Sequence, residues 1–203
     1  MDLLFKSSFK LIESGKVPDQ VIRAGIRHLS KKRLPQEGRY QPERAANRYM
    51  TVLDQLRKSA IAIETDTANE QHYELPTVFF QKVLGKRLKY SASYFETPST
   101  SLNEAEDYAL RCYCERAQLK DGQEILELGC GWGSLSLYMA EHFPNAKITV
   151  VSNSATQRAY IEQQAQNKHF NNLTVVTCDV NILEFEAGRF DRVVSVEMFE
   201  HVR

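Results

Sequence analysis

The chain has 203 residues, a length that fits one domain of ordinary size or one domain with a helical appendage. Its 42% hydrophobic and 26% charged residues can build a core, which excludes a disordered or fibrous protein. Its apolar runs fall short of the roughly 18 residues that a membrane-spanning helix needs. The apolar start at residues 3–5 is too short for a signal peptide. We therefore expect neither a secreted nor an integral membrane protein.

Four cysteines show no spacing typical of a disulfide framework, which indicates a reduced, cytoplasmic protein. Cys112 and Cys114 resemble half of a zinc site, but no second pair with suitable spacing follows. We predict that both lie in a helix and that the chain binds no metal.

The charges sum to zero but are unevenly distributed. Residues 1–48 contain 11 Lys and Arg against 5 Asp and Glu, whereas residues 49–203 contain 15 against 21. A basic segment before an acidic body predicts two parts with different partners, although solvated helix faces alone could produce the same pattern. The zero balance speaks against a strongly basic nucleic-acid binder, and no nucleic-acid partner is expected.

The first sixty-odd residues predict helices. One starts after Pro18 and has an apolar face that ends at Leu29. A loop is expected over residues 31–42, before a longer helix with an apolar stripe from Ala45 to Ile63. The polar stretch at 64–71 indicates a linker. We therefore predict a helical cap or lid over residues 1–71 and a second domain over residues 72–203.

From residue 101 onward, helices and strands alternate. Ser101 and Glu104 form a capping-box pattern that predicts a helix to about residue 118. Strands are then expected at 124–129, 147–152, 173–179 and 190–197, with helices at 133–143 and 155–167. Strands separated by helices of this length predict βαβ units, and hence an α/β fold with a parallel, Rossmann-like sheet.

A glycine-rich loop, ELGCGWG, follows the first of these strands and opens a helix. Glycine is required where a backbone turns sharply or where a ligand approaches the main chain. The dinucleotide pattern G-x-G-x-x-G would place its third glycine at Ser134, and the second strand ends in Val151-Ser152-Asn153 without an acidic residue. The loop therefore predicts a nucleotide site but argues against NAD.

The segment ELGCGWGSLSLYMAE resembles motif I of class I S-adenosylmethionine-dependent methyltransferases. More narrowly, the chain resembles the cyclopropane-fatty-acyl-phospholipid synthase family, which includes the plant coclaurine-type N-methyltransferases. The segments that agree in order are HYELP, FF, VLG, YSASYF, ELGCGWG, VSNSATQ and FDRVVSVEMFEH. The resemblance covers roughly residues 72–203, and the helical N-terminus is similar to the plant branch too. It implies a Rossmann-like methyltransferase domain that uses S-adenosyl-L-methionine.

The resemblance also implies which residues hold the methionine part of this cofactor. Tyr90 and Ser91 match the positions that bind its carboxylate and amino end. Gly129 and Gly131 match the positions that expose backbone to the cofactor.

The nucleoside part would be held at the ends of the second and third strands. Asn153 and Gln157 match the ribose positions, while Asp179 and the amide of Val180 match the adenine positions. Each of these residues has an alternative that involves no ligand. Asp179 could be a cap of the strand end and nothing more, and Gln157 could be a simple helix-surface residue.

An acidic pair with a histidine follows the fourth strand, as Glu197, Glu200 and His201. If a helical turn begins at Glu197, its side chain lies near both of the others by i,i+3 and i,i+4 spacing. Methyl transfer to an amine needs a group that accepts the proton of the nucleophile. In the N-methyltransferase branch the matching positions are catalytic, which implies Glu200 and His201 as proton acceptors and Glu197 as the anchor of the substrate ammonium. The alternative is that Glu200 and His201 only cap a helix.

The other branch of the family transfers the methyl group to an unsaturated acyl chain and closes a cyclopropane ring. Its bicarbonate site uses a cysteine where this chain has Ala92, which favours N-methylation of a small amine over a lipid substrate. Glu200 and His201 match both branches, so the residues leave the lipid alternative open.

The printed sequence stops just after the fourth strand, which suggests that the C-terminal half of the domain is missing and that turnover is weak or absent. A non-catalytic cofactor-binding fragment is therefore a second alternative. For a lipid substrate, the basic N-terminal helices suit peripheral contact with an anionic membrane, whereas the acidic body suits a cationic amine.

Overall fold

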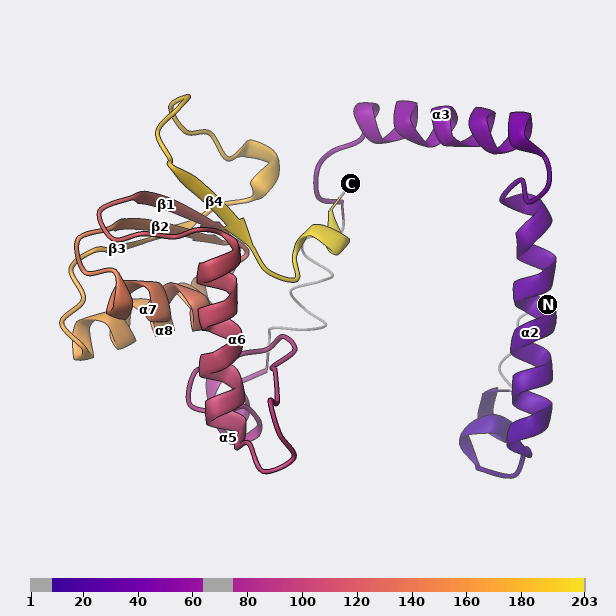
Figure 1. Ribbon diagram of the computed structural model, residues 1–203, viewed down its shortest axis with the longest axis horizontal. Helices are drawn as coiled ribbons and strands as arrows, with labels where there is room; N and C mark the ends of the chain where they lie inside the picture. Colours follow the sequence, from indigo (N-terminus) through magenta and orange to yellow (C-terminus); the bar gives the residue numbers. More distant parts are fainter. Residues whose placement is uncertain (1–8, 64–74, 203) are drawn as a thin grey trace. The chain divides into compact units, whose positions relative to one another are not determined.

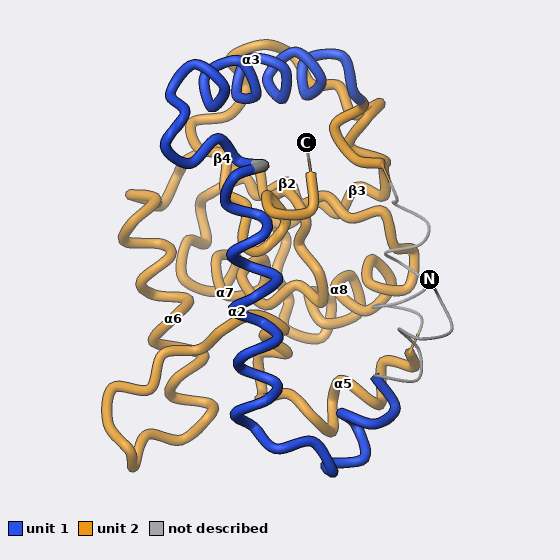
Figure 2. Tube along the Cα trace, turned by 90° about the vertical axis from the view of Figure 1, so that its right-hand side faces the viewer, with its two compact units in different colours: residues 1–59 blue, residues 60–203 orange. Residues whose placement is uncertain are grey.

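Figure 1 shows the computed structural model of the chain, which describes residues 9–63 and 75–202. The chain forms two compact units, residues 1–59 and residues 60–203 (Figure 2). The predicted domain boundary between residues 71 and 72 falls outside the described residues, as do residues 72–74 of the HYELP segment, and so stays a prediction.

Two helices make up most of the first unit: α2 (Asp19–Gln36) and α3 (Pro42–Lys58). The prediction of a loop over residues 31–42 is wrong for residues 31–36, because α2 continues to Gln36 and includes Pro35 in its last turn. Pro35 has no backbone N–H to donate, and few residues of the helix follow it, so the helix ends one residue later. Pro42 occupies the first turn of α3, where its fixed φ favours a helix. This second helix therefore starts earlier than predicted, and it ends before Ile63.

The apolar stripes of these two helices are exposed. In residues 9–59, the side chain of Gln36 aside, Gly38 is the only buried residue. Large exposed side chains include Val21, Ile26, Leu29, Tyr49, Met50, Val52 and Leu56. None of the helices among the described residues is long and apolar enough to cross a bilayer.

The second unit is built on a four-stranded parallel sheet in the order β3-β2-β1-β4. The strands are β1 (Glu124–Leu128), β2 (Lys147–Ser152), β3 (Leu173–Thr177) and β4 (Arg192–Ser195). Leu128 pairs with Val151 and Ser195, so the carboxyl ends of the strands meet at one edge. This confirms the predicted α/β class, the four strands and the Rossmann-like sheet, with β3 and β4 shorter than expected.

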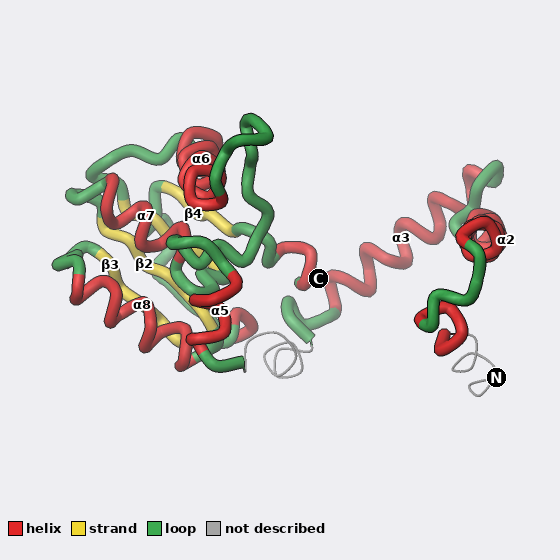
Figure 3. The backbone as a smooth tube through the Cα atoms, turned by 90° about the horizontal axis from the view of Figure 1, so that it is seen from below, coloured by secondary structure: helices red, strands yellow, loops and turns green. Residues whose placement is uncertain are grey.

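Three helices lie on one side of the sheet: α6 (Leu102–Arg116), α7 (Ser134–His142) and α8 (Ala155–Asn167) (Figures 1 and 3). Both α7 and α8 pack against β2 and β3, and α6 packs against α7. The core between these layers contains Ile125, Met139 and Ile148, which are at most 1% exposed. The strand ends are therefore held on a rigid platform.

The predicted capping box at the start of α6 is confirmed. The Glu104 backbone N–H donates to Ser101 Oγ at 3.4 Å, and the Ser101 N–H donates to Glu104 Oε2 at 2.8 Å. Two of the otherwise unpaired groups at the helix start are thus satisfied.

The segment before α6 forms a tight turn around a buried carboxylate. After α5 (Thr77–Val83), Glu106 of α6 accepts the backbone N–H groups of Gly85 (3.1 Å), Arg87 (2.9 Å) and Lys89 (3.4 Å). A Cβ on Gly85 would lie 2.5 Å from this carboxylate, so glycine is required there. This turn fixes the direction in which the chain enters the YSASYF segment.

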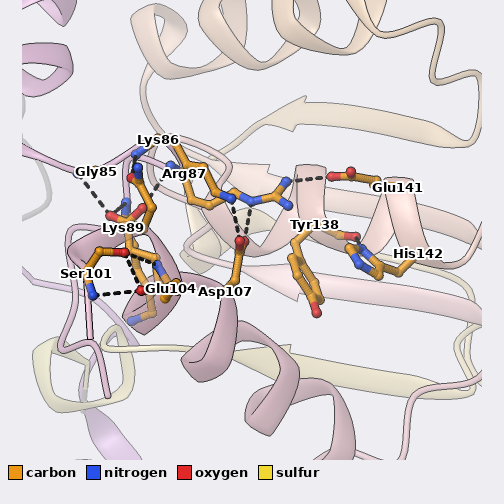
Figure 4. Close-up of polar contacts among 12 residues, drawn as sticks. Gly85, Lys86, Arg87, Lys89, Ser101, Glu104, Asp107, Tyr138, Glu141 and His142 are labelled. Atoms are coloured by element: carbon orange, nitrogen blue, oxygen red, sulfur yellow. Dashed lines mark hydrogen bonds and ion pairs between the residues drawn. The ribbon is translucent and has the colours of Figure 1, made fainter. Parts of the chain in front are cut away.

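An ion-pair network fastens the same turn to the helices. Figure 4 shows Arg87 between Asp107 of α6 and Glu141 of α7, at 2.8 Å and 2.6 Å. The Arg87 side chain is only 13% exposed, so these bonds are stronger than surface ion pairs. The hydrogen bonds from Lys86 and Arg87 outweigh the effect of burial and lower the pKa of Asp107.

Candidate active site

The glycine loop turns sharply at the carboxyl end of β1. The N–H groups of Gly129 and Cys130 both donate to the carbonyl of Val151, at 3.0 and 3.1 Å, which ties the loop to β2. Gly129, Gly131 and Gly133 all have positive φ, between 52° and 76°, a region that residues with a Cβ avoid. Three glycines in five residues are therefore required by backbone conformation.

The three glycines differ in their steric surroundings, which indicates different roles. A Cβ on Gly129 would lie 2.7 Å from Met198 Sδ, and one on Gly133 would lie 2.6 Å from Ile161 Cγ1. A Cβ on Gly131 would meet no atom of residues 9–63 or 75–202 within 4 Å. Gly129 and Gly133 thus allow close packing within the protein, whereas the backbone at Gly131 is open to a ligand.

A pocket of about 80 Å³ lies beside this loop. It is lined by five of the predicted site residues: Tyr90, Ser91, Gly129, Gly131 and Glu197. These come from three places far apart in the sequence, which the fold brings together at the carboxyl edge of the sheet. Small-molecule sites usually hold several hundred Å³, so this pocket can take one end of a cofactor rather than all of it.

A buried carboxylate also lines the pocket. Glu127 of β1 is 3% exposed and accepts a hydrogen bond from Ser136 Oγ at 2.6 Å. Burial raises the pKa of Glu127 to about 8, since the single hydrogen bond only partly offsets desolvation. A perturbed carboxyl group in a concave site is typical of ligand binding, and a cationic group there would favour its ionised form.

Two buried polar atoms of the pocket lining lack a hydrogen-bond partner within the described part of the chain: Trp132 Nε1 and Ser134 Oγ. Trp132 is 2% exposed and packs against the ring of Phe80, with 4.9 Å between ring centroids. Unpaired buried polar groups are costly, and a ligand or water that supplied the missing bonds would remove the cost.

The predicted ribose residues follow β2 but differ in environment. Asn153 is exposed, whereas Gln157 of α8 is 2% exposed. The Gln157 Oε1 atom accepts from Ser152 Oγ at 2.6 Å, and its Nε2 atom has no partner among the described residues. The alternative that Gln157 is a helix-surface residue is therefore wrong.

The predicted adenine residues lie after β3. Asp179 Oδ1 accepts the N–H of Asn181 at 2.8 Å and so caps the short helix η1 (Val180–Ile182). The Asn181 side chain in turn exchanges two hydrogen bonds with the backbone of Ala62, at 3.0 and 2.8 Å. Asp179 therefore caps η1, the turn that follows β3, and the role of residues 179–180 toward a nucleoside stays a prediction.

The predicted i,i+3 and i,i+4 relation needs a helical turn that starts at Glu197, but the turn starts later. The helix η2 spans Phe199–His201, and Glu197 precedes it with a φ of 52°. Its Oε1 atom accepts the N–H of Ala92 at 3.1 Å, which joins the end of β4 to the YSASYF segment. The condition for the i,i+3 and i,i+4 relation, a helical turn that begins at Glu197, is therefore not met. Glu200 and His201 are exposed in η2 and are not among the residues that line this pocket.

Sequence reasoning missed two charged residues of the pocket. Glu127 had a recognisable signal, because a charged residue within the apolar strand EILEL is costly to bury. Lys89 had none: it is one of four basic residues between positions 82 and 89, yet it is 4% exposed and lines the pocket.

The parallel sheet and its glycine loop define a Rossmann-like methyltransferase fold, as a comparison with known proteins shows. A family model described as mycolic acid cyclopropane synthetase matches residues 62–203. The chain therefore belongs to the mycolic acid cyclopropane synthetase family.

Individual relatives fall into both branches of this family. The (S)-coclaurine N-methyltransferase of Thalictrum flavum subsp. glaucum is 38% identical over 194 residues, which are 96% of this chain and 54% of that protein. The cyclopropane-fatty-acyl-phospholipid synthase of Escherichia coli K12 is 34% identical over 133 residues, 66% of this chain and 33% of that protein.

A solved structure agrees with both the fold and the N-terminal helices. Coclaurine N-methyltransferase bound to N-methylheliamine and SAH superposes with a TM-score of 0.81 at 36% identity, over 98% of this chain and 57% of that one. The chain spans about half the length of the coclaurine N-methyltransferases that it matches, and its match covers 33% of the Escherichia coli protein.

Proposed function

We propose that the chain binds S-adenosyl-L-methionine and belongs to an enzyme that transfers its methyl group to the nitrogen of a small amine. The observation that carries the proposal is the glycine loop, whose backbone at Gly131 is open at the carboxyl edge of a parallel sheet. In such sheets ligands bind outside the carboxyl ends of the strands.

The residues present fit this cofactor. Its amino-acid end carries a carboxylate and an ammonium, and the pocket offers the Ser91 hydroxyl for the first and the buried Glu127 carboxylate for the second. Tyr90 lines the same end. A ligand group that reached Trp132 Nε1 or Ser134 Oγ would satisfy buried atoms that have no hydrogen-bond partner among the described residues.

For the nucleoside, the proposal places the ribose at Asn153 and Gln157 and the adenine at Asp179 and the Val180 amide. Amide side chains can donate to and accept from ribose hydroxyls without a charge. The unpartnered Gln157 Nε2 supports this assignment. When bound, the cofactor would supply a methyl group on a positively charged sulfur.

The protein's own task is then to bind and deprotonate the amine. An amine is protonated at neutral pH and must lose a proton before it can attack. We propose Glu200 and His201 as the groups that accept this proton, because the resemblance implies catalytic residues at these positions and they lie three and four residues after the pocket-lining Glu197. The proposal assigns the substrate ammonium to the Glu197 carboxylate, which lines the pocket and accepts the Ala92 N–H.

Two observations favour an amine over an acyl chain. The similarity to an N-methyltransferase spans 96% of the chain, whereas that to the cyclopropane synthase spans 66%. The pocket also contains the Glu197 carboxylate, which suits a positive group rather than an apolar one.

The test is methyl transfer from labelled S-adenosylmethionine to two acceptors: (S)-coclaurine and phospholipid vesicles with unsaturated chains. Calorimetry with S-adenosylhomocysteine on the same protein measures cofactor binding separately. We expect cofactor binding, and label on the amine rather than on the lipid, at a low rate because weak turnover is expected of this chain. Label in the lipid would establish the alternative branch, binding without transfer to either acceptor would support a non-catalytic cofactor-binding chain, and no binding would contradict the proposal.

A further inference from the structure

Lys89 is a buried cation at the edge of the candidate cofactor pocket. It follows Leu88, which has a φ of 48° and is itself 4% exposed. A non-glycine residue in this conformation costs about 1–2 kcal/mol. The turn around Glu106 maintains it, and the result is that Lys89 lies inside the protein rather than in solvent.

The Lys89 ammonium makes three hydrogen bonds, to Ser91 Oγ, to the Ala92 carbonyl and, at 3.1 Å, to Tyr113 Oη. It also lies 4.9 Å from the centre of the Tyr113 ring. In the described ranges no carboxylate forms an ion pair with it. Buried charges are normally paired, because desolvation of an isolated ammonium is expensive.

We propose that Lys89 positions Ser91 and supplies the positive charge that selects the carboxylate of the cofactor's amino-acid end. This inference rests on the proposed function. The three protons of the ammonium are all used, and one is donated to Ser91 Oγ. The Ser91 hydroxyl proton is therefore left to point to a ligand anion, as a donor strengthened by the charge behind it.

The remaining charges of the pocket explain why a cation is needed. The Glu197 carboxylate lines the same space and would repel a ligand carboxylate, as Glu127 would in its ionised form. Among the described residues that line the pocket, Lys89 is the only basic one. The pocket is thus divided by charge, with a positive end at Lys89 and Ser91 for the carboxylate.

The experiment compares two ligands by calorimetry: S-adenosylhomocysteine, and 5′-methylthioadenosine, which has the nucleoside and the sulfur but no carboxylate. For Lys89→Met we expect S-adenosylhomocysteine to bind about 10- to 100-fold more weakly, the loss typical of a hydrogen bond to a charged group. Affinity for 5′-methylthioadenosine should change less than about twofold, within the scatter of contacts that do not involve the residue. Lys120→Met, at an exposed position outside the pocket, is the matched control.

Two further variants separate positioning from structure. Ser91→Ala should show the same selective loss, and the double variant should lose little more than either single one, because Lys89 acts through Ser91. If Lys89→Met fails to fold, Ser91→Ala alone makes the comparison. An equal loss for both ligands, or none, would overturn the inference while leaving the proposed function intact. A wild-type chain that binds neither ligand would contradict the proposed function itself.

Discussion

The environment of Glu127 shows how one residue can link stability to pH. Its carboxyl lies beneath the glycine loop, with Ser136 as its hydrogen-bond donor. Burial also raises the pKa of two neighbouring thiols, that of Cys114 to about 12 and that of Cys130 further, so both stay neutral. Glu127 is thus the group of this cluster that titrates near neutrality.

We expect Glu127→Gln to flatten the pH dependence of stability. The folded chain holds the Glu127 proton up to a pKa of about 8, while the unfolded chain releases it near 4.5. The native state therefore binds more protons between these values, and the unfolding free energy of the wild type falls as pH rises through them. The slope is on the order of 1 kcal/mol per pH unit, measured by urea unfolding from pH 5 to 8.

The control for this prediction is Glu124→Gln, at the partly exposed start of the same strand. Subtraction of the control removes the contributions that other groups make to the pH dependence. Parallel curves for the wild type and Glu127→Gln would show that the buried carboxyl does not titrate in this range.

At the scale of single residues, the sequence predicted part of the lining of the candidate pocket. Tyr90, Ser91, Gly129, Gly131 and Glu197 do line one pocket, as their ordered motifs indicated. The buried state of Lys89 could not be predicted, because it depends on the turn around Glu106, which lies 17 residues away. The late start of η2 was also unpredictable from spacing alone, since Glu197 adopts a left-handed conformation.

At the scale of the elements, the glycine loop needs glycine for two reasons that can be tested separately. Gly133 opens the way for α7 to pack against α8, and Gly131 leaves room for a ligand. Both have positive φ, so alanine at either position carries a similar backbone cost of roughly 1–2 kcal/mol. Only the steric surroundings differ.

Gly133→Ala should therefore destabilise the chain by a further 1–3 kcal/mol or so relative to Gly131→Ala, because its Cβ would overlap buried Ile161. Gly131→Ala should instead weaken S-adenosylhomocysteine binding by more than its loss of stability explains. Chemical unfolding and calorimetry on both variants measure the two effects. Equal unfolding free energies would refute the packing role of Gly133.

Secondary structure was predicted best where periodicity and caps agree. The β2 strand and α8 have the predicted ends, and the capping box of Ser101 marks the start of α6. The chain around Pro35 was predicted less well, because a proline near a helix end is compatible with either a helix or a loop. Local sequence signals could not decide between them.

For the whole molecule, the difference in net charge between the two units is larger than the difference between residues 1–48 and 49–203. Residues 1–59 contain 13 basic and 6 acidic residues, and residues 60–203 contain 13 and 20. The acidic unit is the one with the Rossmann-like sheet and the candidate site. Its negative charge would attract a cationic amine and repel an anionic membrane surface, which agrees with the proposed substrate class.

The central claim is that the carboxyl edge of the sheet binds S-adenosylmethionine. Hydrogen exchange of the chain, with and without saturating S-adenosylhomocysteine, tests it most directly because it locates the bound ligand. The account predicts slower exchange in the glycine loop at residues 129–133, in the segment 89–92 and at the strand ends around residues 153 and 180, with no change at the opposite edge around residues 121–124. Unchanged exchange throughout these segments, or protection confined to the opposite edge, would contradict it.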